Sequence, residues 1–165
     1  MAENLIFSDK EAAFLKELVK QKVQFMIIGL SAAALQGAPV VTQNVDIWFK
    51  DLSDPGIKKA LKKVGAAFVP PIGLNPPMFA GKSVQLFDIV TVMHGLDSFD
   101  EEIENTIELS IGKFSLKAIK LSRIIKSKEA VGREKDRLVL PVLRDALATI
   151  EKISKRRKKS HPLKS

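Results

Sequence analysis

The chain has 165 residues, of which 45% are hydrophobic and 28% are charged. This composition is typical of one folded domain and excludes a chain that is disordered throughout. The absence of cysteine excludes disulfides, thiolate nucleophiles and cysteine-based zinc sites. No apolar run approaches the roughly 20 residues of a membrane-spanning helix, and the N-terminus lacks the basic segment of a secretory signal. We therefore expect a cytoplasmic protein with no membrane partner.

The net charge of +8 is unevenly distributed along the chain. Residues 152–165 contain seven lysines or arginines and no acidic residue, so the rest of the chain carries a net charge of only +1. This pattern predicts a folded domain over residues 1–150 and a basic, disordered tail over residues 151–165. Such a tail either keeps the protein soluble or binds RNA and other polyanions without sequence specificity.

The first half of the chain alternates between helix and strand signals. Ser8 is a typical N-cap, and Glu11 stands at the capping-box position of the helix that follows. Apolar β-branched and aromatic residues predict strands at 23–28 and 45–49, with a short helix at 32–35 between them. A further helix begins at Asp54-Pro55, and an irregular segment rich in proline and glycine follows at 70–77.

The second half begins with a predicted strand at 83–93 and a helical turn at 99–103. Its acidic run at 100–104 is typical of a solvated turn. Alternation of apolar and polar residues predicts a hairpin formed by 106–111 and 113–118. From Lys120 the pattern is helical, with a break at Gly132. Together these elements predict an α+β fold, a mixed sheet with helices packed on it.

Carboxylates on two of the predicted strands are the candidate chemical groups. Position 44 and Asp46 are two residues apart on one strand and so share a face, and Asp88 lies on another strand that could join them. Carboxylate oxygens that converge in this way are ligands for Mg²⁺. The turn at Gly29 and Ser31 could meet phosphates at the start of the following helix. The alternative is a pair of unrelated, solvent-facing aspartates.

The spacing of these residues resembles that of the nucleotidyltransferase superfamily with a DNA polymerase beta-type palm, and especially its small members related to abortive-infection nucleotidyltransferases. Those proteins read Gly-Gly-x-Ala, a helix ending in Gly, then Pro-Arg-x-Thr-x-Asp-hydrophobic-Asp-hydrophobic. The matching residues here are Gly29, Ala32, Gly37, Pro39, Thr42, Asp46 and Ile47. The resemblance continues in the strand Phe87-Asp88-Ile89-Val90-Thr91 and in the loop that contains His94.

A longer motif extends the resemblance toward the C-terminus. The family reads Leu-Ile-x-x-Lys-x-x-x-Gly-Arg-x-Lys-Asp, and the corresponding residues are Ile124, Ile125, Lys128, Gly132, Arg133, Lys135 and Asp136. The resemblance covers roughly residues 22–145 and implies a nucleotidyltransferase palm-like core followed by C-terminal helices. It also implies that the protein uses a nucleoside triphosphate and Mg²⁺, with Asp46 and Asp88 as metal ligands. Gly29, Ser31 and Lys128 would bind the nucleotide, and Asp136 would orient Lys128 or cap the last helix.

Three positions depart from the family pattern. Leu30 replaces the second glycine, Val40 replaces the arginine, and Asn44 replaces the first metal-binding aspartate. A neutral amide at position 44 weakens cation binding, because Coulomb energies at a few ångströms amount to roughly 1–4 kcal/mol. Two interpretations therefore stay open. One is a catalytic site of Asp46, Asp88 and Asn44 that transfers a nucleoside monophosphate to an unknown acceptor; the other is a non-catalytic protein that binds nucleotide, nucleic acid or a partner protein.

Overall fold

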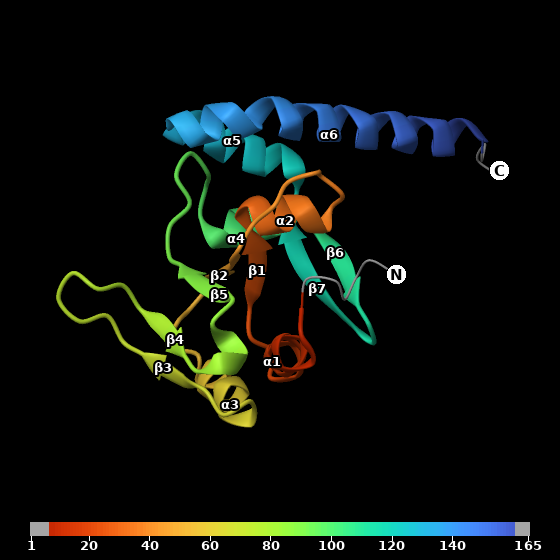
Figure 1. Ribbon diagram of the computed structural model, residues 1–165. Coiled ribbons are helices and arrows are strands. Elements are labelled where there is room, and N and C mark those ends of the chain that lie inside the picture. The colour runs from red at the N-terminus through yellow and green to blue at the C-terminus, as the bar shows by residue number, and fades with distance from the viewer. Residues whose placement is uncertain (1–6, 161–165) are drawn as a thin grey trace.

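The computed structural model describes residues 7–160 and is organised around a five-stranded mixed sheet (Figure 1). The strand order is β5-β2-β1-β7-β6. Strand β1 pairs antiparallel with β2 and parallel with β7, while β5 is parallel to β2. The strands are β1 (Phe25–Ile28), β2 (Val45–Phe49), β5 (Phe87–Val90), β6 (Thr106–Ile111) and β7 (Phe114–Ile119). The predicted α+β class is therefore confirmed.

Helix α1 (Asp9–Lys20) covers one face of the sheet and encloses most of the aromatic core. It begins at the predicted capping box, in which Ser8 and Glu11 each satisfy a backbone N–H of the other. Phe14 is fully buried and packs edge-on against Phe79 and at a tilt against Phe87, at centroid distances of 5.4 and 5.3 Å. Because these buried rings fill the space between α1 and the sheet, this face of the sheet is closed to a ligand.

A two-stranded hairpin projects from the body next to helix α3 (Pro55–Lys63) (Figure 1). It consists of β3 (Ala67–Val69) and β4 (Met78–Ala80), which pair antiparallel. The sequence analysis found only an irregular segment at 70–77, because two strands of three residues carry too little alternation to be recognised. Asp54 caps α3, as predicted, by accepting a hydrogen bond from the Gly56 N–H.

The other face of the sheet is covered by short helices and by the C-terminal helix pair. Helix α2 (Gly29–Leu35) follows β1 directly and begins three residues earlier than predicted. The strand predicted at 83–93 is shorter, since 82–84 forms a 3₁₀ turn before β5. Helix α4 (Phe99–Glu102) and a 3₁₀ turn (Ile103–Asn105) lead into the predicted hairpin of β6 and β7, and helix α5 (Leu121–Val131) ends at Gly132 in the left-handed conformation.

The basic C-terminal segment is helical where the sequence analysis predicted a disordered tail. Helix α6 (Glu134–Ser160) continues without interruption through residues 151–160 and extends beyond the body (Figure 1). Residues 142–160 contain no glycine or proline and are rich in lysine, arginine, leucine and alanine, which are strong helix formers. The predicted tail residues 161–165 lie outside the described part of the chain. Within residues 7–160, no helix combines the length and the apolar character that crossing a membrane requires.

Candidate nucleotide site

The two faces of the sheet differ in chemistry because side chains alternate along each strand. On β2, Val45, Ile47 and Phe49 are buried toward α1, while Asp46 and Trp48 point to the opposite face. Trp48 on that face packs edge-on against Phe99 of α4, with centroids 5.5 Å apart. The candidate site therefore lies on the face opposite α1, at the end of the sheet that contains Asp46 rather than Trp48.

Asp46 and Asp88 lie side by side in this site. They are register partners on the parallel strands β2 and β5, which is the arrangement predicted from the sequence. Neighbouring strands are roughly 4.8 Å apart, so one divalent cation can contact both carboxylates. Burial raises the pKa of Asp46, the negative charge of Asp88 raises it further, and the positive charge of Lys128 partly opposes both effects.

The first residue of α2, which follows β1 directly, lies against the Asp46 side chain of the adjacent strand β2. Gly29 has a φ of +66°, and a Cβ atom at this position would stand 2.7 Å from Oδ2 of Asp46. Ser31 is 1% exposed, and its hydroxyl donates to the Ile28 carbonyl at 2.8 Å and accepts from the Asp46 N–H at 3.2 Å. The hydroxyl of Ser31 thus ties α2 to β2 and positions Asp46, a role that the sequence analysis did not foresee.

A cluster of opposite charge lies across the site, at the junction of α5 and α6. Asp136 is fully buried, and its carboxylate accepts hydrogen bonds from Lys128 Nζ at 3.2 Å, Arg133 Nε at 2.8 Å and the Arg133 backbone N–H at 3.1 Å. These partners, Arg133 first, lower the pKa of Asp136 to about 2. Asp136 therefore orients Lys128 and also caps α6, so both roles anticipated from the sequence are present.

Asp46 and the charge cluster at the α5–α6 junction line a common cavity of about 160 Å³, whereas Asp88 is exposed and is not part of its lining. Gly29, Asp46, Lys128 and Arg133 line it together with Asp136. The ends of β1 and β5, the loop after β5, and α5 complete the wall; these residues are Ile28, Val90, Val92, Met93, His94, Ile124, Ser127 and Val131. The cavity therefore joins residues from β1–α2, β2, the loop after β5, and the α5–α6 junction, which are far apart in the sequence.

Asn44 is placed differently from Asp46. It is exposed and lies in a bend just before β2, where the Thr42 hydroxyl donates to its backbone carbonyl at 2.9 Å. The strand alternation that would aim its side chain with Asp46 does not extend to position 44, and the lining of the cavity does not include it. Among the described residues, no group of three or more histidine, cysteine, aspartate or glutamate side chains could hold a metal ion.

The loop between β5 and α4 is fixed against α5 at two points. The Ser127 hydroxyl donates to the His94 carbonyl at 2.7 Å, and Gly95 lies so close that an added Cβ would stand 2.3 Å from that of Ala130. Glu102 anchors the far end of the loop, because its buried carboxylate accepts from Arg123 Nε at 2.8 Å and from the Asp97 N–H at 2.9 Å. The sequence analysis placed Glu102 in a solvated turn. Its burial depends on Arg123, 21 residues away, which no local pattern reveals.

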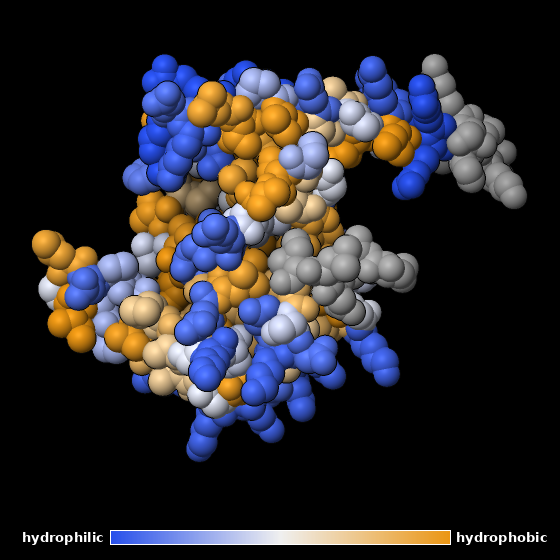
Figure 2. All heavy atoms as spheres, viewed as in Figure 1, coloured by the Kyte–Doolittle hydropathy of each residue, from blue (hydrophilic) through white to orange (hydrophobic). Residues whose placement is uncertain are grey.

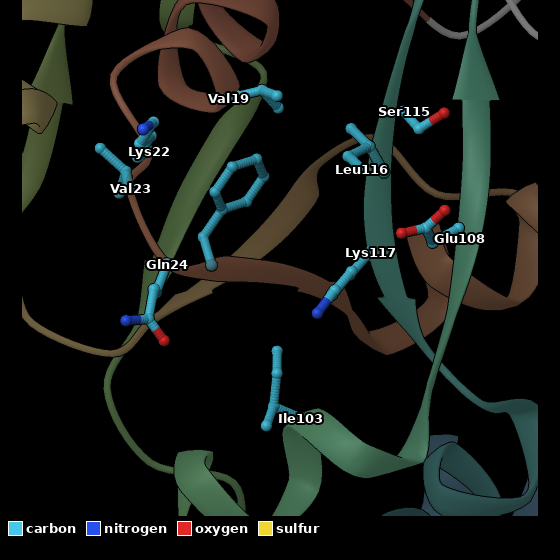
Figure 3. A pocket seen from close by; sticks show the side chains of 10 residues that line it. Val19, Lys22, Val23, Gln24, Ile103, Glu108, Ser115, Leu116 and Lys117 are labelled. Atoms are coloured by element: carbon cyan, nitrogen blue, oxygen red, sulfur yellow. The ribbon is translucent and has the colours of Figure 1, made fainter.

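A second cavity, of about 220 Å³, lies at the opposite end of the sheet (Figure 3). Phe25, Val19 and Leu116 form its apolar part, and Lys117 extends into the space between Gln24 and Ile103 (Figure 3). Glu108 is its only acidic lining residue, so a pair of carboxylates for a divalent cation is absent there. Of the site residues predicted from the sequence, Gly29, Asp46 and Lys128 line the first cavity.

Comparison with known proteins bears on the fold. No protein-family model matches the chain, and no curated protein matches it in sequence. A crystal structure of ANT(2'')-Ia in complex with adenylyl-2''-tobramycin is similar, with a TM-score of 0.55 and 11% identity over 92% of this chain and 96% of that one. The fold of this chain is that of a small nucleotidyltransferase. A solution structure of the antibiotic-resistance factor ANT(2'')-Ia agrees, with a TM-score of 0.51 and 12% identity over 94% of this chain and all of that one.

Proposed function

We propose that this protein binds a nucleoside triphosphate with Mg²⁺ and transfers the nucleoside monophosphate to a hydroxyl acceptor. The observation that supports the proposal is Asp46, which lines one cavity with Lys128 and Arg133 and is the register partner of the exposed Asp88 on the neighbouring strand. Two carboxylates fit a hard cation that keeps several water and phosphate ligands of its own. Bound there, Mg²⁺ would neutralise the charge that develops on the phosphates during transfer.

The protein residues in this proposal act by position and charge. Lys128 offers an ammonium group to the phosphate chain while Asp136 holds its side chain in place. Arg133 lies beside it and offers a guanidinium group that suits phosphate oxygens. Gly29 lines the cavity, and its lack of a side chain leaves room for the Asp46 carboxylate, since an added Cβ would stand 2.7 Å from Asp46 Oδ2. Ser31 contributes indirectly, since its hydroxyl holds the backbone N–H of Asp46.

A second candidate is nucleotide binding without transfer. It is favoured by Asn44, which is an amide exposed in a bend outside β2 and so adds no third carboxylate to Asp46 and Asp88. Two-metal catalysis needs ligands for both ions, whereas binding of a single Mg²⁺–nucleotide complex needs fewer. In this candidate the same cavity holds the nucleotide, and the protein acts as a sensor or a binding partner.

We also propose that the end of α6 binds a polyanion such as RNA. Lys152, Lys155, Arg156 and Lys158 are all exposed on the part of α6 that extends beyond the body (Figure 1). No acidic residue lies among them, so the local potential is positive and attracts phosphate backbones. The acceptor of nucleotidyl transfer is then either this polyanion or a separate molecule.

Calorimetric titration with each of the four Mg²⁺–nucleoside triphosphates tests the function. We expect wild type to bind at least one of them, and Asp46→Ala and Asp88→Ala to abolish Mg²⁺-dependent binding. Asp51→Ala is the matched control, because Asp51 is an exposed carboxylate on the loop after β2, outside the cavity. Binding that survives loss of both Asp46 and Asp88 would refute the site.

The Asn44→Asp variant distinguishes the two candidates. If the missing carboxylate limits catalysis, this change should strengthen Mg²⁺ binding and raise the rate at which a radiolabelled nucleotide is transferred or its pyrophosphate released. If the wild type releases pyrophosphate and Asp46→Ala abolishes this release, the transfer candidate is correct and the Asn44→Asp change is not needed for catalysis. If Asn44→Asp binds nucleotide but releases no pyrophosphate, the binding candidate is favoured.

A further inference from the structure

The hairpin formed by β3, β4 and residues 70–77, here called the arm, exposes large apolar side chains. Ile72 is 65% exposed, Leu74 is completely exposed and Met78 is 53% exposed. The arm projects from the body, and its tip forms an apolar knob on the surface (Figure 1, Figure 2). Single exposed apolar side chains are normal, but several gathered on one projection indicate an interaction surface.

The arm is held in one conformation before any partner arrives. Residues 70–77 contain four of the eight prolines in the chain, and Ile72 and Asn75 exchange two backbone hydrogen bonds of 3.2 and 2.9 Å across the tip. Proline restricts the backbone, so little conformational entropy remains to be lost when the tip is buried. The geometry is therefore that of a preorganised binding element.

An apolar groove lies at the base of the same arm. It measures about 610 Å³, and most of its wall is apolar; the apolar lining residues are Leu52, Pro55, Phe68, Pro71 and Pro77. A cavity of about 150 Å³ accommodates one benzene, so this groove has room for two branched aliphatic side chains. Its polar lining consists of Ser53, Lys58 and Thr91.

The charge pattern restricts what can occupy the groove. Residues 64–81 contain no charged residue, although 28% of the whole chain is charged. Among the residues that the structure describes, Lys58 is the only charged one that lines the groove, so a polyanionic ligand such as nucleic acid finds a single cation there. An uncharged surface of this kind lets two copies of the chain meet without repulsion between like charges.

We propose that the arm joins two copies of this chain into a symmetric dimer, in which the tip of each arm inserts into the groove of the other copy. The knob and one wall of the groove (Phe68, Pro71 and Pro77) lie on the same hairpin, so a twofold axis between two arms would bury both knobs and fill both grooves at once. The side chains inserted are Ile72 and Leu74, and they contact Leu52, Pro55 and Phe68 of the second copy. This proposal is independent of the proposed nucleotide site.

The interface would border the candidate site. Thr91 lines the groove, and the next residue, Val92, lines the nucleotide cavity and is 65% exposed. An inserted arm tip therefore covers the surface beside the cavity entrance. Dimerisation would limit the size of the acceptor that reaches Asp46, if the cavity carries out nucleotidyl transfer.

Sedimentation equilibrium and light scattering after gel filtration test the dimer. Wild type should have twice the chain mass of 18.2 kDa at high concentration, and Leu74→Asp should have the mass of a single chain. Val41→Asp is the control, because Val41 is 92% exposed but lies outside the arm, and it should remain dimeric. Leu74 has no buried contacts to lose, so Leu74→Asp should retain the circular dichroism spectrum of wild type.

Cross-linking tests the proposed contact directly, since the chain has no cysteine. Leu74→Cys and Ser53→Cys place one thiol on the knob and one in the groove, and a covalent dimer should form faster when the two variants are mixed than in either alone. A monomeric wild type at every concentration, or cross-linking that mixing does not raise, would overturn the proposal. If the monomer binds anionic phospholipid vesicles and Leu74→Asp does not, the arm is instead a membrane contact and the proposal is also overturned.

Discussion

The buried carboxylate of Asp136 provides the sharpest test of how the site is held together. Replacing it with asparagine keeps the shape of the side chain but removes the charge that Lys128 and Arg133 share. One pKa unit corresponds to about 1.4 kcal/mol, so a fall of the Asp136 pKa from 3.8 to about 2 sets an upper limit of roughly 2.5 kcal/mol on what the ionised carboxylate contributes to the free energy of unfolding. Because the Arg133 side chain is 53% exposed, solvent screens part of this interaction, and we expect Asp136→Asn to lower the free energy of unfolding by about 1–2 kcal/mol at pH 7.

The pH dependence follows from the direction of the shift. A carboxylate whose pKa is lower in the folded state stabilises the protein above its unfolded pKa, and this stabilisation disappears as the pH falls through the folded value. The difference between wild type and Asp136→Asn should therefore be constant from pH 7 to about 5 and shrink between about pH 4 and 2. Urea unfolding followed by circular dichroism at pH 7, 5 and 3 measures it.

A control separates the buried cluster from ordinary surface ion pairs. Glu129 and Arg144 form a pair of 2.9 Å in which both side chains are about half exposed. Glu129→Gln should cost at most about 0.5 kcal/mol. An equal loss for Asp136→Asn and Glu129→Gln, or a loss for Asp136→Asn that persists unchanged at pH 3, would refute this account of the cluster.

Three further predictions concern the site and α6. Gly29→Ala should lower the free energy of unfolding by about 1–3 kcal/mol and weaken Mg²⁺ binding, because the added Cβ clashes with Asp46. Gly65→Ala is the control, because Gly65 has a similar φ of +70° but no atom near the added Cβ, so it should show only the backbone strain. Thermal unfolding measures the stability of both variants, and calorimetry measures their Mg²⁺ binding. Asp46→Asn should raise the free energy of unfolding at pH 7, because burial and Asp88 raise the pKa of Asp46 and so make its ionised form unfavourable in the folded state. This gain, measured by urea unfolding, should vanish at acidic pH, where Asp46 is protonated. Added Mg²⁺ should stabilise the wild type but not the variant. Replacing Lys152, Lys155, Arg156 and Lys158 with glutamine should leave the unfolding midpoint within the range of a surface change. It should also weaken RNA binding and flatten its salt dependence in fluorescence anisotropy.

The parts of the fold that the sequence predicted are those with a local signal. Ser8 and Glu11 fix the start of α1 by themselves, and the strict alternation of β6 and β7 defines a hairpin without reference to the rest of the chain. The Asp46–Asp88 pair was predictable for a similar reason, since each aspartate stands between apolar residues on a recognisable strand.

The parts that were missed depend on contacts between distant residues. Glu102 is buried only because Arg123 reaches it from α5, and the contact between Gly29 and Asp46 arises from the pairing of β1 with β2. The expectation that Asn44 shares a face with Asp46 rests on strand alternation, and β2 begins at Val45, one residue after Asn44, so it stays a prediction. Strand ends depend on pairing partners rather than on the residues themselves, so alternation cannot be extended past the last paired residue.

The charge distribution of the site argues for a ligand rather than for a purely structural role. A structural ion pair would bring opposite charges together, as Asp136 does with Arg133 and Lys128, and its carboxylate pKa falls accordingly. Asp46 and Asp88 are instead two like charges placed side by side with one of them half-buried, and the pKa of Asp46 is raised. Folding gains nothing from this juxtaposition, and a bound divalent cation would relieve it. Because perturbed carboxylates of this kind gather at functional sites, the unfavourable pair supports a site that Mg²⁺ and a phosphate ligand complete.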